Sequence, residues 1–431
     1  MCNRHDRTHL PRQASRRDVI RLALASLGMA ALGPSVLRRL PVAHAAPQSI
    51  TRLVLVNLVG GNDGLNTVIP RTLSEYYARR PTIRVPAGQE LALTGGANPT
   101  SLYGLHPSLT RLRSLWLEGS AAVVQRVGYP SWNQSHFESS DIYSYGVRNG
   151  FGTLAVPQGG WIGRWCDQYA PTPLGAVALR AGRPTDFAGA STGLFTANDL
   201  ASFLYNADPA YPEDQAHRLG VVQQVLDSHA TPGLSQDARE ALGLGQQLAD
   251  QLQAALAAYT TGVTWPTSTL ASSLRDAAVM IQGGFETRIF YVQTGGFDLH
   301  GAQGAATGSH ATLLASLDAA LGAFVQDMKD RNLWNTTRIV VHSEFGRRAY
   351  ENGSNGTDHG HGNAWFVLGG GIQGGSHGPD LASADLQGEF PGYAVDFRDV
   401  WRDMLANHLG SGDLTQVFPE SQPTSTALGI A

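Results

Sequence analysis

Residues 342–371 read HSEFGRRAYENGSNGTDHGHGNAWFVLGGG, a polar loop enclosed by two apolar runs. The first run, RIVVH, stops just before the carboxylate of Glu344, and the second, NAWFVLGGG, stops at three glycines. Apolar runs of this length bounded by glycine are typical of buried strands. The loop between them contains Asp358, His359 and His361. The stretch therefore predicts an α/β protein that collects acidic and imidazole side chains at strand ends, where metal sites are commonly built.

Further apolar runs along the chain predict more buried strands, at residues 52–59, 121–127, 177–180 and 287–294. Apolar residues at helical spacing predict helices at 107–117, 135–145, 161–169, 212–229, 235–259, 267–281 and 307–332. Strands that alternate with helices predict an α/β class, with a mostly parallel central sheet and helices on both faces. We expect residues 46–431 to form this domain, with a helical insertion or cap within 150–285.

The first 45 residues differ from the rest of the chain. Arg16 and Arg17 precede a short apolar segment, and Ala43 and Ala45 supply small residues for cleavage before residue 46. This pattern predicts a twin-arginine signal peptide, with the twin-arginine translocase as a partner during export and a periplasmic or secreted location. The apolar segment is too short to span a bilayer, so we expect no transmembrane segment in the mature chain. A basic helix of the folded domain and an uncleaved anchor are the alternatives.

Charge and cysteine content restrict the partners of the mature chain. The 431-residue chain has a formal charge of −4, and removal of the eight arginines and two aspartates of residues 1–45 takes it to −10. A negative chain argues against nucleic acid and anionic membranes as main partners. Cys2 leaves with the signal and Cys166 remains alone, so no intramolecular disulfide is expected in the mature chain.

Seven possible metal ligands follow strand ends or precede the last apolar run: Asp63, Asp298, His300, Glu344, Asp358, His359 and His361. Five of the eleven mature histidines fall between residues 300 and 361. Oxygen and nitrogen donors without cysteine favour zinc, manganese, magnesium or calcium, and seven donors are enough for one or two ions. Two alternatives stay open. Asp63 can be a tight-turn residue, and Glu344 can form an ion pair with Arg347 or Arg348.

A polar loop follows the strand predicted at 121–127 and reads YPSWNQSHFE at residues 129–138. The loop after a buried strand is where an α/β enzyme places a nucleophile or a substrate-binding group. Ser135 is the first choice of nucleophile, followed by Ser131 and Thr67. Ser135 can equally be the N-cap of the next helix, with Glu138 at the third position of a capping box. The two roles are compatible, because a helix N-terminus stabilises an anionic ester.

The motifs SRRDVIR, LVLVNLVGGNDGLNTVIP, GLHPSLTRL, NQSHFESSDIY, GGFDLH, SEFGRR, GTDHGHGNAWFVLGGG and VDFRDVW together resemble an exported bacterial family, catalogued as domain of unknown function 1501. That family is grouped with the alkaline phosphatase-like superfamily, so the resemblance implies that fold. It also implies a metal-binding role for Asp63, for Asp298 with His300, for Glu344, and for His359 or His361. Glu344 and Phe345 stand where superfamily enzymes usually have Asp-His.

These observations predict a metal-dependent hydrolase of phosphate or sulfate esters that acts outside the cytoplasm on a small-molecule or glycan ester. Bound metal would activate Ser135 or a water and bind the leaving oxygen, and Arg347 could hold a non-bridging oxygen. The alternative is a non-catalytic exported protein that uses the same fold as a scaffold or binds a glycan or protein partner. The departure at Glu344 and Phe345 favours this alternative, and the dense set of histidines and aspartates opposes it.

Overall fold

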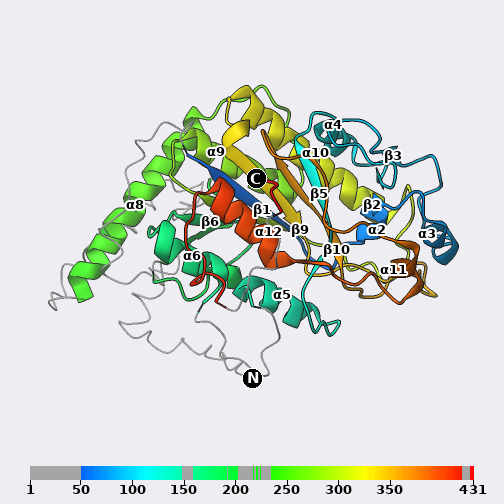
Figure 1. The fold of residues 1–431 in the computed structure, drawn as a ribbon. Coiled ribbons are helices and arrows are strands. Elements are labelled where there is room, and N and C mark those ends of the chain that lie inside the picture. The colour runs from blue at the N-terminus through cyan, green and yellow to red at the C-terminus, as the bar shows by residue number, and fades with distance from the viewer. Residues whose placement is uncertain are drawn as a thin grey trace, which may run out of the picture.

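The computed structural model describes residues 50–147, 159–191, 193–201, 217, 220–221, 224, 234–419 and 428–431. In this part of the chain a nine-stranded sheet crosses the molecule between layers of helices (Figure 1). The strands of this sheet are β1 (Arg52–Leu58), β5 (Ala121–Gly128), β6 (Ala176–Leu179), β7 (Phe195–Ala197), β8 (Ile289–Thr294), β9 (Thr337–His342), β10 (Asn363–Gly369), β11 (Gly375–His377) and β12 (Val395–Asp396). A small second sheet pairs β4 (Gly104–Leu105) with β2 (Val68–Ile69) and β3 (Leu91–Ala92).

The α-helices are α2 (Gly64–Thr67), α3 (Ser74–Arg79), α4 (Thr110–Leu117), α5 (His136–Tyr145), α6 (Trp161–Tyr169), α8 (Leu234–Ala258), α9 (Thr269–Gln282), α10 (Ser309–Asp330), α11 (Ser383–Gln387) and α12 (Phe397–Asp403). Among the described helices, none is both long and apolar enough to cross a membrane. The predicted strands and most predicted helices are present, and α6 begins and ends at the predicted residues.

The strand order of the large sheet is β11-β5-β10-β9-β1-β8-β6-β7, and β12 also pairs with β5. β10 is antiparallel to both of its neighbours, and the other described pairs are parallel. The prediction of an α/β fold with a mostly parallel central sheet is confirmed. Because β10 is antiparallel to β9, the loop at residues 343–362 starts and ends at the same edge of the sheet.

The central strand β1 shows why both faces of the sheet are covered. Leu53 and Leu55 belong to an apolar cluster with side chains of α5, α6 and α12, whereas Val54 and Val56 belong to a second cluster with side chains of α4, α9 and α10. Successive side chains of a strand point to opposite faces, so a strand between two helical layers is apolar throughout. Each such side chain contributes about 1.5–3 kcal/mol when it is fully buried. Helices on both faces, as predicted, follow from this pattern.

Two predicted segments lie outside the described residues. The signal at residues 1–45 is one, and most of the helix predicted at 212–229 is the other, although residues 217, 220–221 and 224 are helical. Within 150–285, β6 and β7 extend the central sheet, and α9 packs against α10. This part of the range therefore belongs to the domain core. A helical insertion or cap stays a prediction for the remainder.

Candidate metal centre

The carboxyl ends of β1, β8 and β9 lie side by side, because these strands are parallel neighbours. The amino end of β10 lies at the same edge, because β10 runs in the opposite direction to β9. The seven predicted ligands are in the segments at these ends: Asp63, Asp298, His300, Glu344, Asp358, His359 and His361. The sheet therefore delivers all of these segments to one edge, and the side-chain contacts decide which groups meet.

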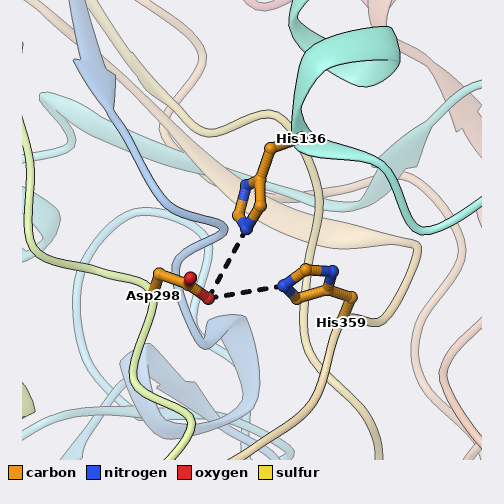
Figure 2. Close-up of side chains that lie close together, drawn as sticks. All are labelled: His136, Asp298 and His359. Carbon is orange, nitrogen blue, oxygen red and sulfur yellow. Dashed lines mark ion pairs between the residues drawn. The ribbon is translucent and has the colours of Figure 1, made fainter.

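Asp298, His136 and His359 form the centre of the site (Figure 2). One ligand atom from each lies within 4.8 Å of the other two. The Nε2 atoms of His136 and His359 lie 3.5 and 3.4 Å from Oδ1 of Asp298. His300 joins this group, because its Nε2 lies 3.0 Å from the same oxygen and 2.9 Å from Nε2 of His359. Three imidazoles from three segments thus converge on one carboxylate oxygen.

The outer nitrogen, Nδ1, of each imidazole is hydrogen-bonded to an oxygen acceptor. The acceptors for His136, His300 and His359 are, in that order, Glu344 Oε1 at 2.8 Å, Asp358 Oδ1 at 3.1 Å and the Gln134 carbonyl at 2.7 Å. Carboxylate and carbonyl oxygens accept hydrogen bonds, so each Nδ1 has a partner to which it can donate, which is the arrangement that leaves Nε2 to coordinate a metal. Each Nε2 then has a lone pair, and all three lone pairs lie on the Asp298 side.

This arrangement fits a divalent cation. The Nε2 atoms of His300 and His359 are 2.9 Å apart and both lie within 3.4 Å of Oδ1 of Asp298, so one ion among them could contact all three atoms. The negative charge of Asp298 and the Nε2 lone pairs of histidines that donate from Nδ1 would both attract a cation. Metal-bound histidines commonly donate their other N–H to a carboxylate or carbonyl, as these three do. Three imidazoles with one carboxylate are the donor set of zinc and other borderline ions.

Glu344, predicted as a ligand, lies behind His136. Besides His136, its carboxylate accepts hydrogen bonds from the backbone N–H of Gly60 at 2.9 Å and from Ser343 Oγ at 3.0 Å. Burial acts to raise the pKa of Glu344, but the hydrogen bonds from His136 and from backbone amides outweigh it and lower the pKa. The same bond to His136 raises the pKa of that imidazole. Glu344 is therefore an ionised group that orients His136, and Asp358 stands in the same relation to His300.

Arg347 lies beneath Asp298 with a side chain that is 0% exposed. Its NH2 is 2.6 Å from Oδ1 of Asp298, and its other nitrogens donate to the carbonyls of Gly61 and Thr357 at 2.6 and 2.8 Å. Burial acts to raise the pKa of Asp298, but the Arg347 hydrogen bond and charge, with the nearby histidines, lower it. Arg347 therefore keeps Asp298 ionised and in position. The predicted contact with a substrate oxygen stays a prediction.

The turn after β1 supplies part of this support and needs glycine to do so. Gly60 and Gly61 have φ values of +117° and +66°, a region that residues with a side chain rarely adopt. A Cβ at Gly60 would also lie 2.5 Å from the backbone nitrogen of Asp298. The turn can therefore approach Asp298 closely enough for its carbonyls to bind Arg347 only because both residues lack a side chain.

Asp63 and His361 have other partners. The Asp63 carboxylate is buried, and its Oδ2 accepts hydrogen bonds from Arg80 and Gln303, each at 2.6 Å. Burial acts to raise the pKa of Asp63, but the charge of Arg80 outweighs it and the pKa is lowered. His361 donates from Nε2 to the Tyr129 carbonyl at 2.6 Å and stacks on Trp132. In the described residues, neither side chain has a contact with the Asp298 group.

The predicted nucleophile loop packs against the site. Ser135 is the N-cap of α5, and its side chain accepts a hydrogen bond from the Glu138 backbone N–H, so the predicted cap is confirmed. The Glu138 side chain contacts Asn133 and leaves the second half of the predicted capping box unformed. Ser131 has a φ of +60°, which is uncommon for a residue with a side chain. The nucleophilic role of either serine stays a prediction.

His136 is the member of this group that was not predicted from the sequence. It is the first residue of α5, directly after the capping serine, and it lies on a segment expected to supply a nucleophile. A usable signal was present, because a histidine at a helix start after a buried strand lies at the same sheet edge as the other ligands. His136 now replaces Asp63 and His361 in the group that converges.

The chain matches the family model described as "Protein of unknown function (DUF1501)" over residues 50–409 and belongs to that family. No curated protein matches it.

Three solved structures are similar over most of the chain. Ps i-CgsB in complex with k-i-k-neocarrahexaose is 11% identical, with a TM-score of 0.38, over 85% of this chain and 74% of that one. A protein in the alkaline phosphatase superfamily from Vibrio parahaemolyticus is 12% identical, with a TM-score of 0.35, over 84% and 71%. The PsFucS1 sulfatase from Pseudoalteromonas sp. is 12% identical, with a TM-score of 0.33, over 88% and 70%. At these values the likeness assigns neither residues nor an activity.

Proposed function

We propose that this protein is an exported, metal-dependent hydrolase of phosphate or sulfate esters. The observation that carries the proposal is the convergence of three imidazole Nε2 atoms on Oδ1 of Asp298, at 3.0 to 3.5 Å, with each Nδ1 hydrogen-bonded behind. Ester hydrolysis is the chemistry that the sequence motifs imply for such a site. Export rests on the paired arginines and the cleavage pattern of residues 1–45.

The ligand group that we propose holds one ion and consists of His136, His300, His359 and Asp298. Its three imidazoles favour zinc over manganese, magnesium and calcium, which suit oxygen-rich sites. These four residues would hold the ion, and a divalent ion held there would supply Lewis-acid polarisation of an ester and a lowered pKa for water. A second ion has less support, because Asp63 is 2% exposed and bonded to Arg80 and Gln303, and His361 is bonded to a backbone carbonyl.

The other residues of the site keep these ligands in position. Glu344 holds His136, Asp358 holds His300, and buried Arg347 holds Asp298. The exposed side of the group faces solvent, since the Asp298 and His300 side chains are each 45% exposed. An ester can therefore reach the ligands from solvent. Ser135, which caps α5 beside His136, remains the proposed nucleophile, with a metal-bound water as its competitor.

The test is metal content together with ester hydrolysis. We expect the exported chain, after washing, to contain about one zinc ion and to hydrolyse a phosphomonoester, a phosphodiester or a sulfate ester. His136→Ala should lower metal affinity by roughly 100-fold or more. Loss of a residue that only hydrogen-bonds to a ligand typically lowers affinity 10- to 100-fold, and loss of a ligand itself should cost more. The matched control is His377→Ala, a partly buried histidine on β11, which should change neither property.

Less than one bound ion per wild-type chain would remove the basis of the proposal. One bound ion without turnover on any of the three ester classes would favour the non-catalytic binding protein. Hydrolysis that persists undiminished in His136→Ala and Asp298→Ala would place the active site elsewhere on the chain.

A further inference from the structure

A polar cavity of about 260 Å³ lies beside the metal centre, between the carboxyl ends of β1, β8 and β9, the helix α5 and residues 183–186. Glu344 lines this cavity and also accepts the hydrogen bond from His136. A group bound in the cavity would therefore be separated from a metal ligand by one side chain. The cavity is in the correct place for the organic part of an ester whose charged group binds to an ion held by Asp298 and the three histidines.

The floor of the cavity is a row of polar side chains across the sheet. Asn57 pairs in register with Gln293 of β8 and with His342 of β9, so the three residues lie side by side on one face. Two residues earlier, the same face carries Leu55, Tyr291 and Val340, which belong to an apolar cluster. Polar residues in a row on a buried parallel sheet cost stability unless they are paired, and such departures mark functional sites.

The wall of the cavity is one face of α5. Ser140 and Ser144 line the cavity and follow His136 at intervals of four residues, so all three lie on the same side of the helix. Tyr143, the residue before Ser144, also lines the cavity. One helix face therefore serves both the metal centre at its first turn and the cavity further along.

Two buried side chains in the cavity wall lack hydrogen-bond partners. Both ring nitrogens of His342 and the hydroxyl of Tyr143 have none among the described residues. His342 is 7% exposed and Tyr143 6% exposed. Burial lowers the pKa of His342 to about 3, so its ring is neutral and has one donor and one acceptor to offer. An unsatisfied buried polar group costs about 1–3 kcal/mol, and a hydrogen-bonding ligand would recover this.

Three charged side chains line the cavity, and two of them, Asp186 and Glu344, already accept hydrogen bonds. Asp186 accepts hydrogen bonds from Ser144 Oγ at 2.8 Å and from Trp161 Nε1 at 3.1 Å, and Glu344 is bonded as described above. The groups that remain for a ligand are three neutral ones, the Gln293 amide, the His342 ring and the Tyr143 hydroxyl. Beside them, the exposed guanidinium of Arg183 can donate hydrogen bonds to hydroxyl or ester oxygens. They favour a ligand that carries several hydroxyl groups. They disfavour an alkyl chain, which would bury these groups unpaired.

We propose that the cavity binds a single hydroxylated ring, a sugar unit, and that the ester substrate is a sugar phosphate or sugar sulfate. This inference rests on the proposed hydrolase function for the ester, and on the cavity alone for the sugar. The volume of about 260 Å³ is just below the roughly 300–1,000 Å³ of typical small-molecule sites, which limits the bound part to one ring.

The first experiment measures sugar binding directly, by saturation-transfer NMR and calorimetry on the exported chain with D-glucose, D-galactose and D-mannose. We expect millimolar binding of at least one of the three. Gln293→Leu, which keeps the size of the side chain and removes its hydrogen bonds, should weaken that binding about tenfold. The matched control is Gln168→Leu on α6, where the amide contacts the Asp413 carbonyl outside the cavity.

The second experiment compares hexose 6-phosphate and 6-sulfate with para-nitrophenyl phosphate and sulfate. Gln293→Leu should lower kcat/KM for the hexose esters about tenfold and change kcat/KM for the aryl esters less than twofold.

The two proposals can fail separately. Binding of a hexose that Gln293→Leu weakens, without cleavage of any ester, would support the cavity and contradict the hydrolase. Absence of binding to all three hexoses, or binding and turnover that Gln293→Leu leaves unchanged, would overturn the sugar proposal. Thermal unfolding of the variant distinguishes a lost contact from a lost fold.

Discussion

Asp63 and Asp298 both follow a buried parallel strand at the same edge of the sheet, yet their side chains have different partners. Asp298 is partly exposed and meets three imidazoles, whereas Asp63 turns inward to Arg80, a guanidinium with a 0% exposed side chain. Gln303 donates to Asp63 and accepts from Thr357, whose carbonyl binds Arg347. Asp63 therefore supports the site from behind, through a chain of buried hydrogen bonds.

This difference predicts opposite results for two isosteric substitutions. Asp63→Asn leaves the buried charge of Arg80 without its partner, so the free energy of unfolding should fall by about 3–5 kcal/mol. Bound metal should stay near the wild-type amount. Asp298→Asn also removes the charge partner of a buried arginine, Arg347, but here the carboxylate is 45% exposed and solvent weakens the ion pair. It should therefore cost less stability than Asp63→Asn, and it should abolish metal binding. Urea unfolding and metal analysis of both variants check this, and metal loss in folded Asp63→Asn would restore Asp63 as a ligand.

The sequence was informative about ligands that are close together in the chain. Asp298 and His300 are two residues apart after one strand, so a shared site follows from local geometry. His136 contacts Glu344 across 208 residues, and no local pattern relates them. Asp63 finds Arg80 only 17 residues later, but the pair depends on how the intervening loop packs. Residue types and strand ends were therefore predictable, whereas the choice among donors depended on tertiary packing.

At the scale of elements, α5 combines two tasks in one helix. Its N-cap residue Ser135 closes the first turn, and the next residue, His136, enters the metal centre. Gly146 ends the helix in the left-handed conformation, with φ of +63°. Because the helix is only ten residues long, a frayed first turn would move His136 directly. The cap therefore affects the geometry of the site.

Two substitutions at Ser135 separate capping from catalysis. Ser135→Ala should lower the free energy of unfolding by about 0.5–2 kcal/mol. Ser135→Asn keeps a good capping residue, so its free energy of unfolding should stay within a few tenths of a kcal/mol of the wild-type value. If Ser135 is the nucleophile, both variants lose ester hydrolysis. Retained kcat in Ser135→Asn, with thermal stability and metal content unchanged, would assign the attack to a metal-bound water. The measurement is kcat on the best ester of the substrate screen.

Strands were easier to predict than their order. The apolar runs of β1, β5, β8, β9 and β10 are visible in the sequence because both of their faces are buried. The sequence does not show which strands are neighbours in the sheet. β1, for example, lies between β8 and β9, which follow it by more than 200 residues. The antiparallel direction of β10 is set by the loop at 343–362, which returns to the edge that it left.

The two ends of the sheet have opposite character across the whole molecule. The carboxyl end carries the histidines and carboxylates of the site. The amino end carries arginines, among them buried Arg52 at the start of β1. His408 lies at this end and donates from Nε2 to the Arg52 carbonyl at 3.0 Å. Burial, together with the charges of Arg338 and Arg288, lowers the pKa of His408 from 6.5 to about 4 despite this bond.

The lowered pKa of His408 predicts acid sensitivity of the fold, independent of the metal centre. Between pH 6.5 and about 4 the unfolded chain binds a proton at His408 that the folded chain does not. The free energy of unfolding must then decrease as the pH is lowered through this range, by up to about 1.4 kcal/mol per pH unit. Above pH 6.5 the stabilising contribution of neutral His408 is fully present.

His408→Gln keeps an amide donor for the Arg52 carbonyl and cannot take up the proton. Between pH 6.5 and 4 the free energy of unfolding of this variant should decrease less than that of the wild type, by on the order of 2–3 kcal/mol. Above pH 7 the pH dependence of the two proteins should differ little. The control His377→Gln, on β11, should follow the wild-type curve. Urea unfolding at a series of pH values gives the free energy of unfolding of each protein against pH. Parallel curves for His408→Gln and the wild type would contradict the prediction, because His408 would then be protonated as readily in the folded protein as in the unfolded chain.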